Sequence, residues 1–208
     1  MKIGLALIVC LFSMALHASQ RAVTDEGDIV ILNDDGTWHF DDPTTVETEE
    51  IPTNEQPFVK PDKSSFKLKS TRNNSEVWLD AKKWTFEKSK SNDAAEYSFV
   101  LKGKDLYGMF ITEQIEIGME SLAQIALENA RAGAPNMRVT EKEYRNVNGV
   151  SVIYMEMEGT LQGTSFTYLG YYYSNETGTT QFITYTGTSL VKKYKSEIED
   201  FLNGFSIP

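Results

Sequence analysis

The chain has 208 residues, 30 of them acidic and 20 basic, which gives a formal net charge of -10 at pH 7. Proteins that bind nucleic acid need basic surfaces to neutralise its phosphates, so this excess of carboxylates argues against a nucleic-acid partner. One cysteine and two histidines leave little scope for thiol chemistry or for zinc sites built from Cys and His.

Residues 1–18 have the organisation of a secretory signal peptide. A basic residue precedes an apolar run over 3–16, and small residues follow it. The run is shorter than the roughly 20 apolar residues that a membrane-spanning helix needs. We expect cleavage after Ala18, which removes Cys10 and His17 and leaves a periplasmic or secreted protein with no further apolar segment that could span a membrane. A form tethered by this segment is the alternative.

Residues 19–40 are predicted to form an N-terminal β-hairpin segment. An apolar strand over 29–32 precedes turn-forming residues over 33–36, and Gly36 can adopt the positive φ that such a turn needs. The pattern V-x-L-x-D-D-G-T-W over 30–38 resembles a short segment found near the start of many exported bacterial proteins. The same acidic residues do not have the spacing of an EF-hand calcium loop.

Residues 41–65 have the composition of a linker. They contain seven acidic and two basic residues, four of the six prolines and one aromatic residue. A segment of this kind buries too little apolar surface to offset the chain entropy lost on folding. We therefore predict a disordered acidic linker, with a partner-binding acidic tail as the alternative.

The segment 66–208 is predicted to be a single folded domain rich in strands. Alternating and aromatic patterns predict strands before and after a helix over 118–132, and a last amphipathic helix over 189–203. The pair Asn148-Gly149 predicts a hairpin, and the strand that follows it is apolar on both faces, so we expect it to be central in the sheet. The expected strands are 66–70, 77–80, 83–87, 96–102, 106–112, 137–147, 150–158, 164–174 and 179–186.

This order of elements predicts an α+β fold in which an antiparallel β-sheet is flanked by two helices. The order, the V-W-L-D-A-K-K-W segment over 77–84 and the terminal amphipathic helix resemble the PsbP-like superfamily, which includes the photosystem II extrinsic protein and the Ran-binding Mog proteins. The family often has a proline-glycine-tryptophan turn where this chain has 77–84. The resemblance implies a sandwich fold for 66–208.

Catalytic candidates are few once residues 1–18 are removed. His39 is then the only imidazole, and it lies in the predicted hairpin, far in sequence from any serine or threonine of the main domain that it could activate. Glu156 and Glu158 lie on one face of a strand, about 6.5 to 7 Å apart along it, which overlaps the carboxyl separation of inverting glycosidases. The simpler interpretation makes both residues part of a solvated or ion-paired strand end.

Four tyrosines are the candidate ligand-binding residues: Tyr168, Tyr171, Tyr172 and Tyr173. Tyrosine has a flat apolar face and a polar tip, so a group of them can form a stacking platform for a sugar or a peptide. Alternation along a strand sends Tyr168 and Tyr172 to one side and the other two to the opposite side, so at most half of them can be free.

The signal-peptide pattern and the shortage of catalytic residues favour a non-catalytic exported protein of the bacterial cell envelope. We expect it to bind or assemble with another envelope protein or a small ligand. We expect no cofactor and no enzymatic activity. Two alternatives stay open: a carbohydrate hydrolase that uses Glu156 and Glu158, and a carrier of a small ligand or of a metal coordinated by oxygen atoms.

Overall fold

The structure is a computed structural model that describes residues 20–24, 29–33, 36–40, 50–90 and 94–208. The chain divides into two compact units, Met1–Thr45 and Val46–Pro208. The second unit is called the main domain below. The predicted signal peptide, residues 1–18, lies outside the described residues, as does the segment 41–49 of the predicted linker.

The first unit contains a small antiparallel sheet in the order β1-β2-β3. Its strands are β1 (Gln20–Val23), β2 (Ile29–Leu32) and β3 (Trp38–Phe40). The last two lie where the sequence predicts a hairpin, and Gly36 between them has a φ of +81°. The strand β1 extends the expected pair by a third strand.

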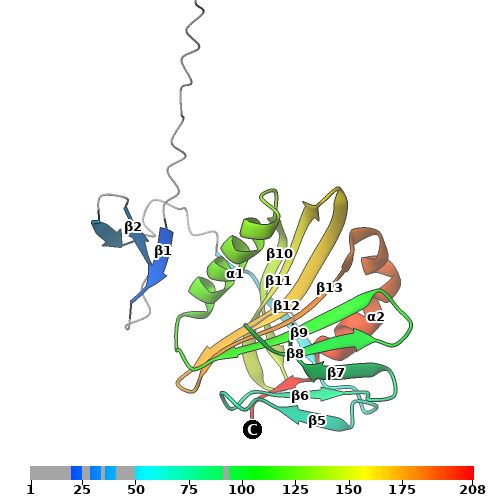
Figure 1. The fold of residues 1–208 in the computed structure, drawn as a ribbon. Coiled ribbons are helices and arrows are strands. Elements are labelled where there is room, and N and C mark those ends of the chain that lie inside the picture. The colour runs from blue at the N-terminus through cyan, green and yellow to red at the C-terminus, as the bar shows by residue number, and fades with distance from the viewer. Residues whose placement is uncertain (1–19, 25–28, 34–35, 41–49, 91–93) are drawn as a thin grey trace, which may run out of the picture. The chain divides into compact units, whose positions relative to one another are not determined.

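The main domain is built on a mixed sheet of eight strands in the order β4-β10-β11-β12-β13-β9-β8-β7 (Figure 1). Neighbours pair in antiparallel fashion except β4 and β10, which are parallel. The strands are β4 (Thr53–Phe58), β7 (Trp84–Lys88), β8 (Ala95–Leu101), β9 (Leu106–Glu113), β10 (Arg138–Val147), β11 (Val150–Leu161), β12 (Thr164–Asn175) and β13 (Gly178–Gly187).

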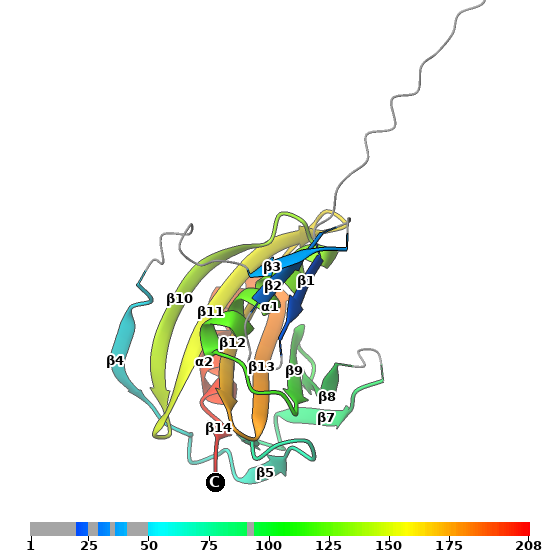
Figure 2. The same cartoon turned by 90° about the vertical axis from the view of Figure 1, so that its left-hand side faces the viewer.

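Two helices cover opposite faces of this sheet (Figures 1 and 2). The helix α1 (Met119–Gly133) packs on β11 and β12, and α2 (Val191–Leu202) packs on β12 and β13. Because side chains alternate along a strand, Ile153 faces the side of α1, whereas Val152 and Tyr154 belong to the core beneath α2. The strand β11 is therefore central and buried on both faces, as the sequence predicts. Within the described residues, no helix is long and apolar enough to cross a membrane.

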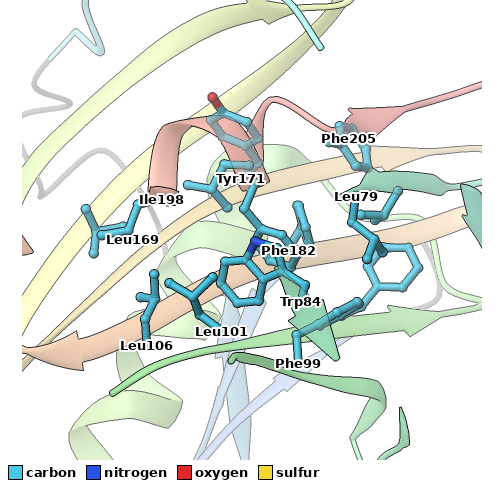
Figure 3. Close-up of a cluster of buried hydrophobic side chains, with 14 of the residues drawn as sticks. Leu79, Trp84, Phe99, Leu101, Leu106, Leu169, Tyr171, Phe182, Ile198 and Phe205 are labelled. Atoms are coloured by element: carbon cyan, nitrogen blue, oxygen red, sulfur yellow. The ribbon is translucent and has the colours of Figure 1, made fainter. Parts of the chain in front are cut away.

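A second, three-stranded sheet closes the α2 side of the core. It has the order β14-β6-β5 and consists of β5 (Phe66–Lys69), β6 (Glu76–Leu79) and β14 (Phe205–Ser206). Trp84 stacks on Phe201 of α2 at 4.0 Å between ring centroids. Figure 3 shows Trp84 in the same buried cluster as Phe99 and Phe182. Gly108 makes room for the ring of Phe201, because a Cβ atom there would lie 3.0 Å from it. The terminal helix and the small sheet thus share one aromatic core.

The predicted linker boundary is wrong for the part of 41–65 that the structure describes. Thr53–Phe58 form β4, and the backbone N–H groups of Tyr144 and Asn148 donate to the carbonyls of Pro52 and Phe58 at 2.8 and 2.9 Å. A sheet-edge strand is paired on one side only, so it tolerates Pro57 and a polar composition that otherwise resembles a linker. Its parallel pairing also makes the sheet mixed, where the sequence predicts an antiparallel one.

Candidate functional site

A pocket of about 390 Å³ lies between α2 and the end of the sheet that contains β4. We call it the Arg145 pocket. Strands β4, β10, β11 and β12 contribute its floor and sides, and α2 contributes the remaining wall. Its lining residues of main interest are Asn54, Phe58, Glu141, Arg145, Tyr154, Glu156, Leu169, Tyr171, Val191, Lys195, Ile198, Glu199 and Leu202.

Arg145 lies in this pocket because alternation along β10 sends Tyr144 to the α1 side and Arg145 to the α2 side. Its side chain is only 11% exposed. The guanidinium lies 3.4 Å from the ring centroid of Tyr154 and 4.5 Å from that of Phe58, and its Nε donates to Glu143 Oε1 at 2.6 Å. Burial lowers the pKa of Arg145, but Glu143 and the hydroxyls of Tyr171 and Tyr154 together raise it by more. The cation is therefore fixed and its charge is balanced by Glu143.

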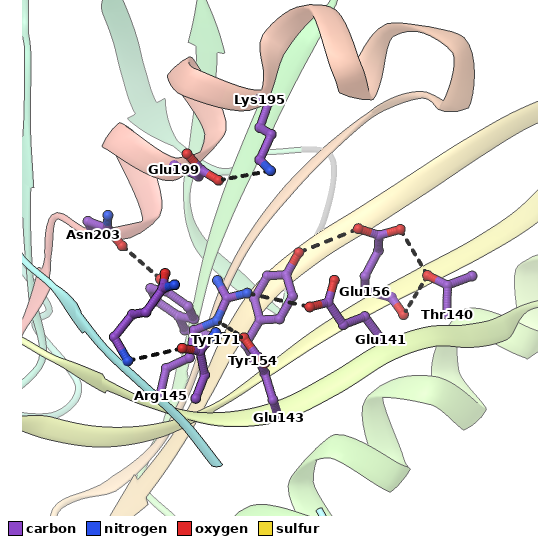
Figure 4. Close-up of polar contacts among 12 residues, drawn as sticks. Thr140, Glu141, Glu143, Arg145, Tyr154, Glu156, Tyr171, Lys195, Glu199 and Asn203 are labelled. Atoms are coloured by element: carbon purple, nitrogen blue, oxygen red, sulfur yellow. Dashed lines mark hydrogen bonds and ion pairs between the residues drawn. The ribbon is translucent and has the colours of Figure 1, made fainter. Parts of the chain in front are cut away.

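Two further carboxylates, Glu141 and Glu156, occupy directly opposed positions on β10 and β11 (Figure 4). Glu156 accepts hydrogen bonds from Thr140 Oγ1 at 2.9 Å and from the hydroxyl of Tyr154 at 3.4 Å. Burial, followed by the negative charges of Glu143 and Glu156, raises the pKa of Glu141 above its ordinary value. The two side chains therefore make an electronegative region in the wall of the pocket.

The α2 wall combines an apolar surface with one exposed ion pair. Val191, Ile198 and Leu202 supply its apolar part, and Lys195 pairs with Glu199 at 3.7 Å along the helix. Leu169 of β12, the cross-strand partner of Glu156, continues the apolar surface onto the sheet. At the base, the hydroxyl of Tyr171 donates to Asn203 Oδ1 at 2.8 Å. The arrangement suits an amphipathic molecule, because one side of the pocket is apolar and the other carries charge.

The structure does not bring the four candidate tyrosines together. Tyr171 and Tyr173 lie on the α2 side and Tyr168 and Tyr172 on the α1 side, which is the alternation expected from the sequence. Only Tyr171 lines the pocket, and it is 1% exposed. Tyr172 is fully buried, and burial raises its pKa. Because both faces of β12 are covered, these residues do not form one shared stacking platform.

Tyr168 and Tyr173 are the two candidates that stay half-buried outside the pocket. Tyr173 packs on Phe205, with ring centroids 5.6 Å apart. The ring of Tyr168 packs against Phe166 and Tyr185, with ring centroids 5.2 and 5.7 Å away. Tyr185 in turn stacks on Tyr107 at 5.4 Å. These rings lie across β12, β13 and β9, so cross-strand packing explains why aromatic side chains occur here.

The proposed carboxylate pair is not brought into one pocket either. Glu156 lines the Arg145 pocket, whereas Glu158 lies outside it and pairs with Arg138 at 3.5 Å. His39 lies in β3, with its Nδ1 atom 3.5 Å from the side-chain amide of Asn33. Within the residues that the structure describes, no group of three or more His, Cys, Asp or Glu side chains is arranged to hold a metal ion.

The sequence interpretation missed the residues that build the pocket. Glu141, Glu143 and Arg145 recur at every second position of β10, a pattern that resembles a solvent-facing strand surface. Asn54 of β4 donates to Glu143 Oε1 at 2.9 Å, so a segment interpreted as linker completes the polar cluster. The alternation of charges was the available signal, but it does not show that α2 and β4 cover this surface.

A buried carboxylate away from the pocket, Glu96, was also missed. It is 7% exposed and accepts hydrogen bonds from the hydroxyls of Ser70, Thr71 and Thr112, each at 2.7 Å, and from the backbone N–H of Thr71 at 2.8 Å. Burial raises the pKa of Glu96, but these hydrogen bonds lower it by more, so it lies below its ordinary value. Every bond is made within the fold, so Glu96 joins the loop after β5 to the main sheet.

Comparisons with known proteins identify the fold of the main domain. No protein-family model and no curated protein matches the sequence. The solution structure of cyanobacterial PsbP (CyanoP) from Synechocystis sp. PCC 6803 superimposes with a TM-score of 0.55 and 12% sequence identity, over 69% of this chain and 92% of that chain. The main domain has a PsbP-like fold. At this identity the likeness concerns the fold alone, and it is the fold expected from the order of elements.

Two further structures resemble the PsbP-like domain less closely. The protein of unknown function PA94 from Pseudomonas aeruginosa gives a TM-score of 0.43 at 9% identity, covering 64% of this chain and 90% of that chain. A protein from Bacteroides thetaiotaomicron gives the same TM-score and identity, covering 70% and 49%.

Proposed function

We propose that this protein is a non-catalytic binding protein of the bacterial envelope, and that its PsbP-like domain holds a small organic ligand in the Arg145 pocket. Export to the periplasm or the cell exterior is part of the proposal and rests on the signal-peptide pattern of residues 1–18.

The pocket itself is the observation that carries the proposal. Ligand sites in proteins are concave, have volumes of roughly 300 to 1,000 Å³, and combine apolar walls with a few converging polar groups. The Arg145 pocket, at about 390 Å³, has this size and this composition. Its polar residues are held in place by ordered contacts, namely Arg145 by Glu143 and two aromatic rings, and Glu156 by Thr140. A preorganised site of this kind binds without first ordering its own side chains.

A fragment screen by methyl NMR tests the proposal, because the apolar wall carries four reporter residues. In mature protein labelled at Ile, Leu and Val methyls, fragments should shift the signals of Leu169, Val191, Ile198 and Leu202. Val191→Trp places a large ring in the lining of the pocket and should abolish the shifts of the other three residues. Lys192→Trp places the same ring on the exposed side of α2 and should preserve them. The proposal fails if no fragment at millimolar concentration shifts the pocket methyls.

A turnover assay tests the non-catalytic part. Purified mature protein should not hydrolyse a panel of glycosides, esters and peptides. Activity that Glu156→Gln abolishes would establish the hydrolase alternative.

A further inference from the structure

We infer that the ligand of the Arg145 pocket is a small amphipathic cation: an aliphatic ammonium ion whose charge lies beside Glu141 and Glu156 and whose chain lies along the apolar wall of α2. This inference rests on the proposed function and adds the chemical class of the ligand.

The lining of the pocket carries more negative than positive charge. Arg145 is balanced by Glu143, and Lys195 is paired with Glu199. Glu141 and Glu156 remain. The nearest cationic nitrogen recorded for Glu141 is Nη2 of Arg145, at 3.9 Å, and the hydrogen-bond donors to Glu156 are hydroxyls. The pocket therefore holds negative charge that its own cations do not neutralise.

The carboxylates of Glu141 and Glu156 lie next to each other on the sheet. They are direct cross-strand partners, and like charges at such positions repel. Burial contributes most to the raised pKa of Glu141, and the negative charges of Glu143 and Glu156 add to it. An ammonium ion between the two would replace a repulsive contact by two charge-assisted hydrogen bonds.

The contacts of Arg145 disfavour an anion as the ligand. The only buried cation of the pocket, Arg145, is stacked between Tyr154 and Phe58 and bonded to Glu143. An incoming carboxylate or phosphate would have to compete with Glu143 for the guanidinium while it passes Glu141, Glu156 and Glu199. The net charge of -10 for the whole chain adds to this bias.

The apolar part of the lining favours a ligand with an alkyl chain. Leu169, Ile198 and Leu202 are each at most 5% exposed, so their side chains are fixed in the core and show the pocket a small, rigid apolar surface. The half-buried side chains of Val191 and Phe58 extend this surface. A bare metal cation gains nothing from such a surface. An alkyl chain does, because removing its CH₂ groups from water is favourable.

The test compares three probes that share a six-carbon chain: hexylammonium, 1-hexanol and hexanoate. Each is titrated at pH 7 into methyl-labelled mature protein, with the shifts of Leu169, Val191, Ile198 and Leu202 as readout. Hexylammonium should bind at least tenfold more tightly than 1-hexanol, and hexanoate should bind more weakly than either.

Charge variants then locate the cation. Glu156→Gln should weaken hexylammonium binding at least fivefold and leave 1-hexanol binding unchanged. Glu141→Gln, at a more exposed carboxylate, should also weaken hexylammonium binding. Glu158→Gln is the matched control, because it removes the same charge from the same strand outside the pocket. Its affinity for hexylammonium should equal that of the wild type.

The outcomes separate this inference from the proposed function. Equal binding of hexylammonium and 1-hexanol, or a preference for hexanoate, would overturn the cation assignment and leave a ligand pocket in place. Tighter binding of a lysine tripeptide blocked at both ends would replace the small molecule by a lysine side chain of a partner protein. If none of the probes shifts the pocket methyls, the inference is wrong, and the fragment screen decides the proposed function independently.

Discussion

Replacing Arg145 by methionine should release β4 from the sheet and destabilise the main domain. Arg145 links this edge strand to the fold in two ways. Its guanidinium stacks on Phe58 of β4, and it holds Glu143, which accepts the amide hydrogen of Asn54. Methionine keeps most of the apolar stem and removes the cation, so Glu143 would be left buried with one neutral donor.

The expected cost follows from the contacts that are lost. A hydrogen bond to a charged group contributes about 1.5 to 3 kcal/mol, and the cation–π contacts with Tyr154 and Phe58 contribute about 0.5 to 2 kcal/mol. We therefore expect the free energy of unfolding to fall by roughly 3 kcal/mol, which agrees with the cost of breaking other buried ion pairs. Urea denaturation at pH 7 measures this change, and hydrogen exchange should show early opening of Thr53–Phe58.

Arg138→Met is the matched control. Arg138 lies on the same strand and pairs with Glu158 at 3.5 Å on the surface, where its side chain is 65% exposed. Exposed pairs contribute little, so this variant should lose less than about 1 kcal/mol. A loss below about 1 kcal/mol for Arg145→Met, with unchanged exchange in β4, would refute the view that Arg145 holds the edge strand.

Three further predictions concern other parts of the chain. Glu96→Gln should lower the free energy of unfolding in urea by about 2 kcal/mol. Because the folded-state pKa of Glu96 is lowered, its contribution is complete above the ordinary value of 4.5 and is lost as the pH falls below it, so wild-type stability should decline more steeply there than that of the variant. Gly204→Ala should reduce stability by at least about 2 kcal/mol in thermal denaturation, since its Cβ atom would lie 1.9 Å from the carbonyl oxygen of Trp78; an unchanged midpoint would contradict this close approach. Mass spectrometry of protein recovered from its host should find Ser19 at the N-terminus, and abundant peptides that contain Cys10 would disprove cleavage after Ala18.

The elements of the main domain could be predicted because their patterns are local. The hairpin between β10 and β11 follows from Asn148-Gly149, whose φ angles of +52° and +87° are those that a tight hairpin turn requires. The apolar stripe of α2 is also readable, since Tyr194, Ile198 and Phe201 recur at helical spacing and all three are buried.

The strand β4 and the pocket could not be predicted, because both depend on pairings between distant segments. The polar, proline-containing sequence of Thr53–Phe58 becomes a strand only through β10, about ninety residues later in the chain. The charges of β10 resemble a solvated surface until α2 covers them. For the same reason Tyr171 and Tyr172 resemble a binding platform in sequence, whereas both are buried by elements that a local pattern does not place.

Crystals of the mature protein soaked in hexylammonium give the most direct test of the Arg145 pocket as a ligand site. We expect density for the alkyl chain along Leu169, Ile198 and Leu202, with the nitrogen about 3 Å from a carboxylate oxygen of Glu141 or Glu156. An empty pocket at saturating hexylammonium, or a chain bound elsewhere on the domain, would contradict it.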